Sequence, residues 1–405
     1  MPSYDYFKTV RSVSAFQEKR ESVETMKGKT SLRELIEDKQ GETRTWKPSA
    51  SNWNENHLLA CKVICRQPRG TELPLLAHKD FWPDETEDLE DCVQQLIQGP
   101  LKPKEADDKD PRPATMEELG KRSEGQLVRF YKPDTLGYVW SGLARLLQAK
   151  GPSPVQGSRA DRKRKRPAEE AQVDRFSASK AAGRDGEDSG CSSDEYIQRV
   201  AKPPTEEATL YFANMFIRCA LIYGQPEEQD RSLDLCQEHQ KYSFKRGALA
   251  MNATDDGRIY FPTKDDEGER IAALIEAKRC LNPKCLPNEV LAQLVGDALA
   301  LKVSGAATAS KTDFVTIYVA GHRMRFLHFR ITDNYAKELL KPFDEETVHE
   351  EAENSTTSDS EIDVNKFMVV DSSKLLHLDK EDDREAAVKN IIALTRWAQR
   401  LLHED

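Results

Sequence analysis

The sequence predicts an α/β protein, with a mixed β-sheet flanked by helices in the second half of the chain. In the stretch 271–278, the residues before Glu276 are apolar on both faces, which indicates a central strand covered above and below. Residues 205–223 and 288–303 carry apolar side chains at helical spacing. Residues 151–202 hold hardly any large apolar side chain, so we expect a disordered linker between this sheet and a mainly helical N-terminal region.

Composition limits the possible classes of protein. The chain has 405 residues, 38% hydrophobic and 32% charged, so it can form a core while much of it must be solvated surface or linker. Its formal net charge of -10 restricts any attraction to nucleic acid to a local basic patch. The first residues lack an apolar run, and no stretch is long and apolar enough for a membrane span. We therefore expect a protein inside the cell with no membrane partner.

The first half of the chain is predicted in two parts. Residues 1–45 are polar and charged apart from a short amphipathic patch near residues 32–36, so we expect a flexible N-terminal arm. Residues 46–150 form the mainly helical region, because residues 84–98 have helical spacing and residues 116–147 suit two helices separated near Lys132 and Pro133. The Pro- and charge-rich residues 101–115 between them are predicted to form a loop.

The linker at residues 151–202 contains a compact basic run, made of Arg162, Lys163, Arg164, Lys165 and Arg166. Such a run is typical of a nuclear import signal or of a patch that binds nucleic acid. An ordinary charged linker is the alternative. We expect recognition by an import receptor and a nuclear location, with the cytoplasm as the alternative.

The second half, residues 203–403, is predicted to be one domain. Its helix at 205–223 begins with Thr205 as N-cap, followed by two acids in the first turn, where carboxylates suit the helix dipole. Strands are predicted at 242–251 and 258–261, joined by an Asp-Gly turn, and then at 271–278, 313–320 and 323–331. An acidic loop at 344–363 and an amphipathic helix at 381–403 complete the domain.

Two groups of residues could suggest other chemistry. The eight cysteines include no CxxC pair with a nearby histidine doublet, so we expect buried free thiols rather than a zinc site. The predicted last strand is basic, since it carries His322, Arg323, Arg325, His328 and Arg330. This strand could contact phosphates, or it could simply be a solvated strand face.

The strand at 271–278 ends in Glu276-Ala277-Lys278. Residues two apart in a strand share a face, so the carboxylate and the amine emerge together. The same spacing occurs by chance at residues 37–39 and 107–109, in polar sequence. Only at Glu276 does it close an apolar strand, and a helix carrying Gln293 follows.

This arrangement resembles the core of the PD-(D/E)xK nuclease-like superfamily, which has the restriction-endonuclease-like fold, and in particular its mostly uncharacterised members from filamentous fungi. The resemblance rests on a helix with acids in its first turn, an Asp-bearing hairpin, a strand ending in (D/E)xK and a helix with a Gln. It covers about residues 203–331.

The resemblance implies that Asp256, Glu276 and the carbonyl group of Ala277 bind Mg²⁺ or Mn²⁺. It implies that Lys278 orients or deprotonates the attacking water, with Gln293 at the strand end. It also implies that Glu207 is the acid of the first helix, although Glu206 is the neighbouring alternative.

The upstream acid departs from the superfamily pattern, because no Pro-Asp pair opens the preceding strand. Asp256 is the expected substitute, with Asp255 as its neighbour, yet an Asp-Gly turn accounts for both without catalysis. We therefore expect a metal-dependent nuclease that hydrolyses phosphodiester bonds, of DNA rather than RNA. A catalytically inactive module that binds nucleic acid or protein on the same fold is the alternative.

Overall fold

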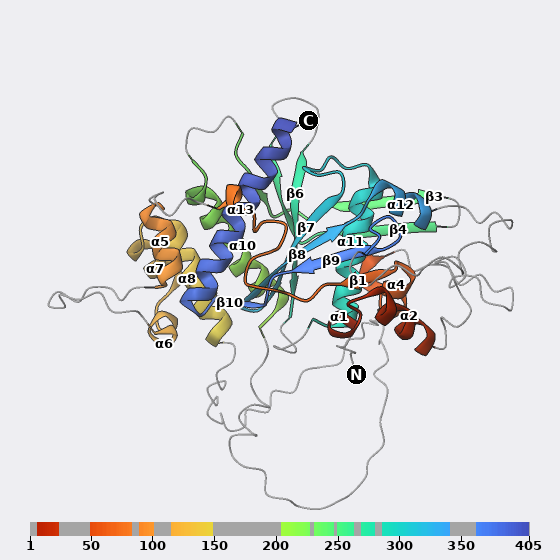
Figure 1. Ribbon diagram of the computed structural model, residues 1–405. Helices are drawn as coiled ribbons and strands as arrows, with labels where there is room; N and C mark the ends of the chain where they lie inside the picture. The colour runs from red at the N-terminus through yellow and green to blue at the C-terminus, as the bar shows by residue number, and fades with distance from the viewer. Residues whose placement is uncertain are drawn as a thin grey trace, which may run out of the picture.

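A central β-sheet is covered by helices on both faces in a computed structural model of the chain (Figure 1). The structure describes residues 6–23, 49–82, 89–100, 115–148, 204–226, 231–246, 249–262, 269–279, 286–340 and 362–404. The helices are α1 (Tyr6–Thr9), α2 (Val13–Ser22), η2 (Ala50–Asn52), α4 (Glu55–Ala60), η3 (Lys79–Phe81), α5 (Asp91–Gln98), α6 (Met116–Gly120), α7 (Glu124–Phe130), α8 (Asp134–Gln148), α10 (Glu206–Gly224), α11 (Asn288–Ser304), α12 (Asp333–Leu339) and α13 (Glu381–Glu404). The strands are β1 (Val63–Cys65), β2 (Asp234–Cys236), β3 (Lys241–Arg246), β4 (Leu249–Thr254), β5 (Gly257–Phe261), β6 (Arg270–Lys278), β7 (Asp313–Ala320), β8 (Arg323–Arg330), β9 (Met368–Ser372) and β10 (Leu376–His377). The α/β class, with a sheet flanked by helices, is thus confirmed.

The main sheet is mixed. Its strands follow the order β1-β9-β8-β7-β6-β5-β2, and β10 pairs with β8 beyond the end of β9. The pairs β6–β7 and β1–β9 are parallel, whereas β8 runs antiparallel to both of its neighbours and β5 to both of its own. The parallel register brings the carboxyl ends of β6 and β7 to one edge, with Lys278 opposite Ala320.

β6 is the central strand that its sequence predicts, since every residue from Ile271 to Ala277 is buried. One face of the sheet packs on α10 and α13, where Ile275 shares a core with Phe216. The other face packs on α11, where Leu274 shares a second core with Leu294. A strand with helices on both sides must be apolar on both faces, which explains its continuous apolar sequence.

The two helices next to β6 begin and end as their sequences suggest. The side chain of Thr205 accepts a hydrogen bond from the amide of Ala208 and caps α10, which the acids Glu206 and Glu207 then open. α11 ends at Gly305 in the left-handed conformation, with φ of 77°. Within α11, a Cβ on Gly296 would lie 2.8 Å from the Cβ of Ala50, so this glycine lets η2 approach closely.

The expectation of a flexible arm at residues 1–45 is wrong for residues 6–22, which form α1 and α2. Tyr6 is fully buried: its hydroxyl donates to the carbonyl of Val63 at 2.8 Å and its amide donates to Asn288 at 3.2 Å. Phe7 and Phe16 are buried in the same core as α11. Aromatic side chains spaced within an otherwise polar segment anchor it, and this signal outweighs its average polarity.

Residues 46–150 are mainly helical where the structure describes them, but they do not form a separate unit. β1 from this region pairs with β9 at the edge of the main sheet. Trp140 of α8 and Val93 of α5 belong to the same core as Phe212 of α10. The helices α5 to α8 therefore form an outer layer over α10 and α13 (Figure 1).

The predicted hairpin between residues 242–251 and 258–261 is wrong. Residues 241–254 fold back on themselves, so that β3 pairs with β4 as a separate two-stranded sheet. β5 pairs instead with β6 and β2 in the main sheet. Asp255 and Asp256 thus form the corner between two sheets, and Gly257 follows where a Cβ would lie 2.9 Å from the carbonyl oxygen of Cys236.

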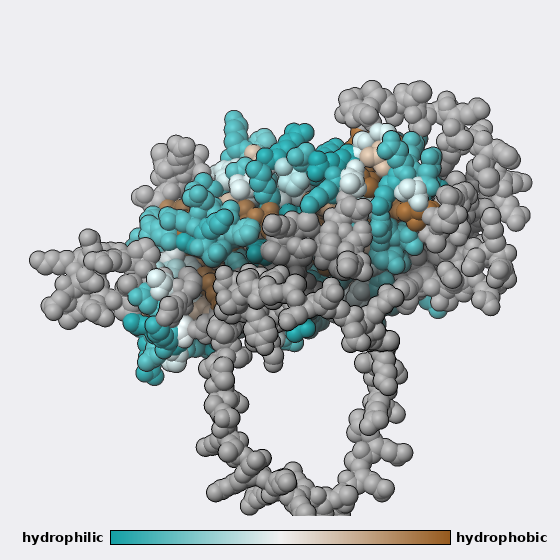
Figure 2. Space-filling model, turned by 90° about the horizontal axis from the view of Figure 1, so that it is seen from below, coloured by the Kyte–Doolittle hydropathy of each residue, from teal (hydrophilic) through white to brown (hydrophobic). Residues whose placement is uncertain are grey.

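The visible surface of the described residues is mostly hydrophilic, with apolar areas that are small and separate (Figure 2). None of the helices in the described ranges has the length and apolarity needed to cross a lipid bilayer. Cys61, Cys65, Cys92 and Cys219 are buried free thiols, as expected. The linker with its basic run 162–166, and the acidic loop apart from residues 362 and 363, lie outside the described residues, so these predictions and the domain limits they set remain predictions.

Candidate functional site

Glu276 is the centre of the candidate site. It lies near the carboxyl end of β6 on the face that α11 covers, and it is 2% exposed. The amide Nε2 of Gln293, in α11, donates to Oε1 of Glu276 at 2.5 Å. The ammonium group of Lys278 forms an ion pair with the same carboxylate oxygen. The structure therefore brings together the strand acid, the lysine and the helical glutamine, as the resemblance implied.

Glu206, at the start of α10, is the helical acid that reaches this group. Its Oε1 lies 3.3 Å from Nζ of Lys278. Glu207, the residue expected in this role, is fully exposed and does not join the group. Consecutive helical residues point in directions about 100° apart, so only one of the two can face the strand end, and the orientation of α10 selects Glu206.

The two adjacent acids of the corner have different partners. Asp255 is buried, and its carboxylate accepts from the amide of Gln240 and from the hydroxyl of Tyr242, both at 2.7 Å. It therefore holds the corner to β3. Asp256 faces the end of β6, because its Oδ2 accepts from the amide of Ala277 at 2.8 Å. Asp256 is the acid next to Glu276, as expected.

A further acid, Asp297, was not predicted from the sequence. It lies in α11 one helical turn after Gln293, on the same face, and is 4% exposed. Its carboxyl group interacts electrostatically with Glu276, Lys278 and Asp256. The signal was present in the sequence, since an acid four residues after Gln293 lies within the apolar run of a buried helix.

The site has more buried acid than base. Burial raises the pKa of Glu276 to about 8, despite the opposing effect of Lys278. Burial likewise raises the pKa of Asp256, and it raises that of Asp297 well above the ordinary range. Burial lowers the pKa of Lys278, but the acids Glu276, Glu206 and Asp256 together raise it by more, so the ammonium stays charged. The buried Glu276 and Asp297 and the half-buried Asp256 thus interact with one ammonium, and a bound cation would allow the three carboxyl groups to ionise together.

The donor atoms available for a cation are oxygens. Carboxylates of Asp256 and Glu276 with a main-chain carbonyl form the kind of set that suits Mg²⁺ or Mn²⁺. In the described ranges, only a different group, His322, His377 and Asp379, brings three ligand atoms within 4.8 Å of one another. The acids near Glu276 therefore form no three-carboxylate cage, and water or a phosphate would have to supply further ligands, which is usual for Mg²⁺.

The basic strand does not form a phosphate-binding face, and it is not a solvated face either. β8 lies inside the sheet, where His328 is buried with its Nε2 2.8 Å from Asp313. The guanidinium of Arg325 lies 5.1 Å from the ring centroid of Phe7, a residue of α1. His328 is thus paired with an acid and Arg325 lies against an aromatic ring, contacts that an alternating sequence pattern could not reveal.

Comparison with models of known protein families finds no match for the chain, and neither does a search of curated proteins.

Proposed function

We propose that the chain is a metal-dependent nuclease of the PD-(D/E)xK type, with a restriction-endonuclease-like core made of α10, β2, β5, β6, α11 and β7. The observation that supports this best is the convergence of Asp256, Glu276, Lys278 and Gln293 at the carboxyl end of β6. These residues come from three segments, yet they meet where a buried acid and an amine already share a strand face. The superfamily resemblance rests on the same residues.

Each residue of the group would have its own role in the proposed reaction. Asp256, Glu276 and the carbonyl of Ala277 would hold Mg²⁺ or Mn²⁺, which when bound polarises a phosphate and acidifies water. Lys278 carries a raised pKa, so it orients the water and offsets charge that develops on the phosphate, rather than removing a proton. Gln293 fixes the carboxylate of Glu276 by its hydrogen bond, and Glu206 holds Lys278 from the other side.

The proposed substrate is nucleic acid, DNA rather than RNA. The test incubates the purified full chain with plasmid DNA, single-stranded DNA and RNA, each with Mg²⁺, Mn²⁺ or EDTA. We expect metal-dependent cleavage that falls on the order of 100-fold or more in Glu276→Gln and Lys278→Met, because each removes a group that acts on the transition state. Glu207→Gln is the matched control, since this acid lies outside the site.

Cleavage that persists unchanged in Glu276→Gln and Lys278→Met would refute the site. Absence of cleavage on every substrate, together with metal-independent binding of DNA, would support the non-catalytic binding module. That alternative is favoured by one observation: in the part of the chain that the structure describes, the acids near Glu276 do not bring three ligand atoms within 4.8 Å of one another.

We also propose that the basic run of residues 162–166 directs the chain to the nucleus through an import receptor. Replacing Lys163, Arg164, Lys165 and Arg166 with alanine should prevent nuclear accumulation of the fluorescently tagged full chain. An unchanged distribution would contradict import by this run.

A further inference from the structure

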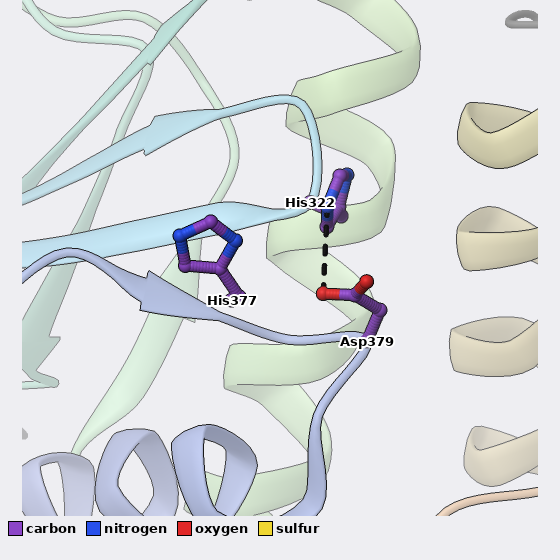
Figure 3. A group of neighbouring side chains, drawn as sticks. All are labelled: His322, His377 and Asp379. Carbon is purple, nitrogen blue, oxygen red and sulfur yellow. Dashed lines mark ion pairs between the residues drawn. The ribbon is translucent and has the colours of Figure 1, made fainter. Parts of the chain in front are cut away.

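Three metal-ligating side chains gather at one end of the sheet, apart from the residues around Glu276. His322 lies in the turn between β7 and β8, His377 in β10, and Asp379 two residues further on (Figure 3). One ligand atom from each lies within 4.8 Å of the other two. Nε2 of His322 is 3.5 Å from Oδ1 of Asp379. The side chain of His322 is 4% exposed, whereas that of Asp379 is exposed, so the group opens to solvent on one side.

The main chain holds the two contributing segments in place. β10 pairs with the start of β8, and the amide of Leu378 donates to the carbonyl of His322 at 2.9 Å. The amide of His377 donates to the carboxylate of Asp383, in the first turn of α13, at 2.9 Å. The segments that carry His322 and His377 are therefore hydrogen-bonded to each other and to the start of α13 before any ion binds.

The donor chemistry differs from that around Glu276. Two imidazoles and one carboxylate suit a borderline transition metal such as zinc, rather than Mg²⁺, which prefers oxygen ligands alone. Three protein ligands leave a fourth position of a tetrahedral zinc ion for water. Nε of Arg323 is 3.4 Å from Nδ1 of His377, a long contact that a metal ion would displace.

We propose that His322, His377 and Asp379 form a zinc-binding site that ties the start of α13 to the β7–β8 turn. The site does not depend on nuclease activity, because it shares no residue with the group around Glu276. The proposed zinc site and the group around Glu276 nevertheless lie at the same sheet edge, because Ala320, two residues before His322, is opposite Lys278. Zinc there would stiffen the edge that carries the proposed catalytic lysine.

The experiment titrates the metal-stripped full chain with zinc chloride, followed by calorimetry and by competition with a chromogenic zinc indicator. His377→Ala and Asp379→Asn are expected to weaken zinc binding at least about 10-fold, because even partners that only orient a ligand change metal affinity by that much. Arg323→Ala should bind zinc at least as tightly as the unmodified chain. His403→Ala, at an exposed histidine outside the group, is the matched control.

Folding and site identity are checked with the same proteins. Far-ultraviolet circular dichroism shows whether each variant is folded. If His377→Ala does not fold, the test uses Asp379→Asn, which changes an exposed position. Zinc should raise the thermal midpoint of the unmodified chain and of Glu276→Gln, but not that of Asp379→Asn. Lack of zinc binding by the unmodified chain would overturn the proposal, as would equal binding by Asp379→Asn, or loss of binding only in Glu276→Gln.

Discussion

Replacing Glu276 with glutamine should change how the stability of the metal-free protein depends on pH. The pKa of this carboxyl group rises from 4.5 to about 8 on folding, mainly because of burial. Between these values the native state holds a proton that the unfolded chain releases, so the free energy of unfolding falls as pH rises. One pKa unit corresponds to about 1.4 kcal/mol, so the whole shift amounts to on the order of 5 kcal/mol.

The measurement is urea-induced unfolding in EDTA at a series of pH values from 5 to 9. The unmodified chain should lose stability relative to Glu276→Gln across this range, because glutamine keeps the oxygen that accepts from Gln293 but does not ionise. Lys278 stays charged throughout, so its contribution is constant. Glu207→Gln, an exposed acid nearby, should follow the unmodified chain. Parallel pH profiles for the unmodified chain and Glu276→Gln would refute this reasoning.

Four other substitutions test the roles inferred from the structure. Asp297→Asn should decrease the stabilisation of the protein by Mn²⁺ in thermal melts, because the Asp297 carboxyl group interacts electrostatically with Glu276 and Asp256. Asp255→Asn should lower stability by roughly 1–3 kcal/mol in urea unfolding by weakening buried hydrogen bonds, whereas Asp256→Asn should reduce cleavage with little loss of stability. Gly296→Val should destabilise by at least about 1–3 kcal/mol, since even a Cβ would lie 2.9 Å from the ring of Trp53, and unchanged melting would contradict this packing.

The centre of the fold could be predicted because its sequence is locally consistent. β6 shows a continuous apolar run and α11 a helical apolar pattern, and both form within a residue or two of the predicted limits. The pairing of Glu276 with Lys278 follows from strand geometry alone. Local sequence could not show which strands pair with each other. The corner at Asp255 and Asp256 connects two sheets, whereas the same residues would suit an ordinary hairpin turn.

The parts that were missed depend on long-range packing. β1 has only three residues, too few for a periodic signal, and its partner β9 lies about 300 residues away in the sequence. The choice between Glu206 and Glu207 depends on how α10 is rotated against the sheet, which its apolar face sets only within the assembled core. Asp297 was overlooked because a single acid within the apolar pattern of a helix is usually an isolated polar residue rather than part of a functional site.

The pairing of β1 with β9 has a consequence for synthesis of the chain. β1 leaves the ribosome long before β9, so its backbone edge and the apolar side chains of α1 and α4 must wait for most of the protein to be translated. Unpaired strand edges and exposed apolar surface promote aggregation during this interval. A fragment that starts at α10 would have the opposite defect, an uncovered β9 edge and a bare face of α11. Expression of the second half alone should therefore give less soluble material than expression of the full chain, and the two halves should be produced together.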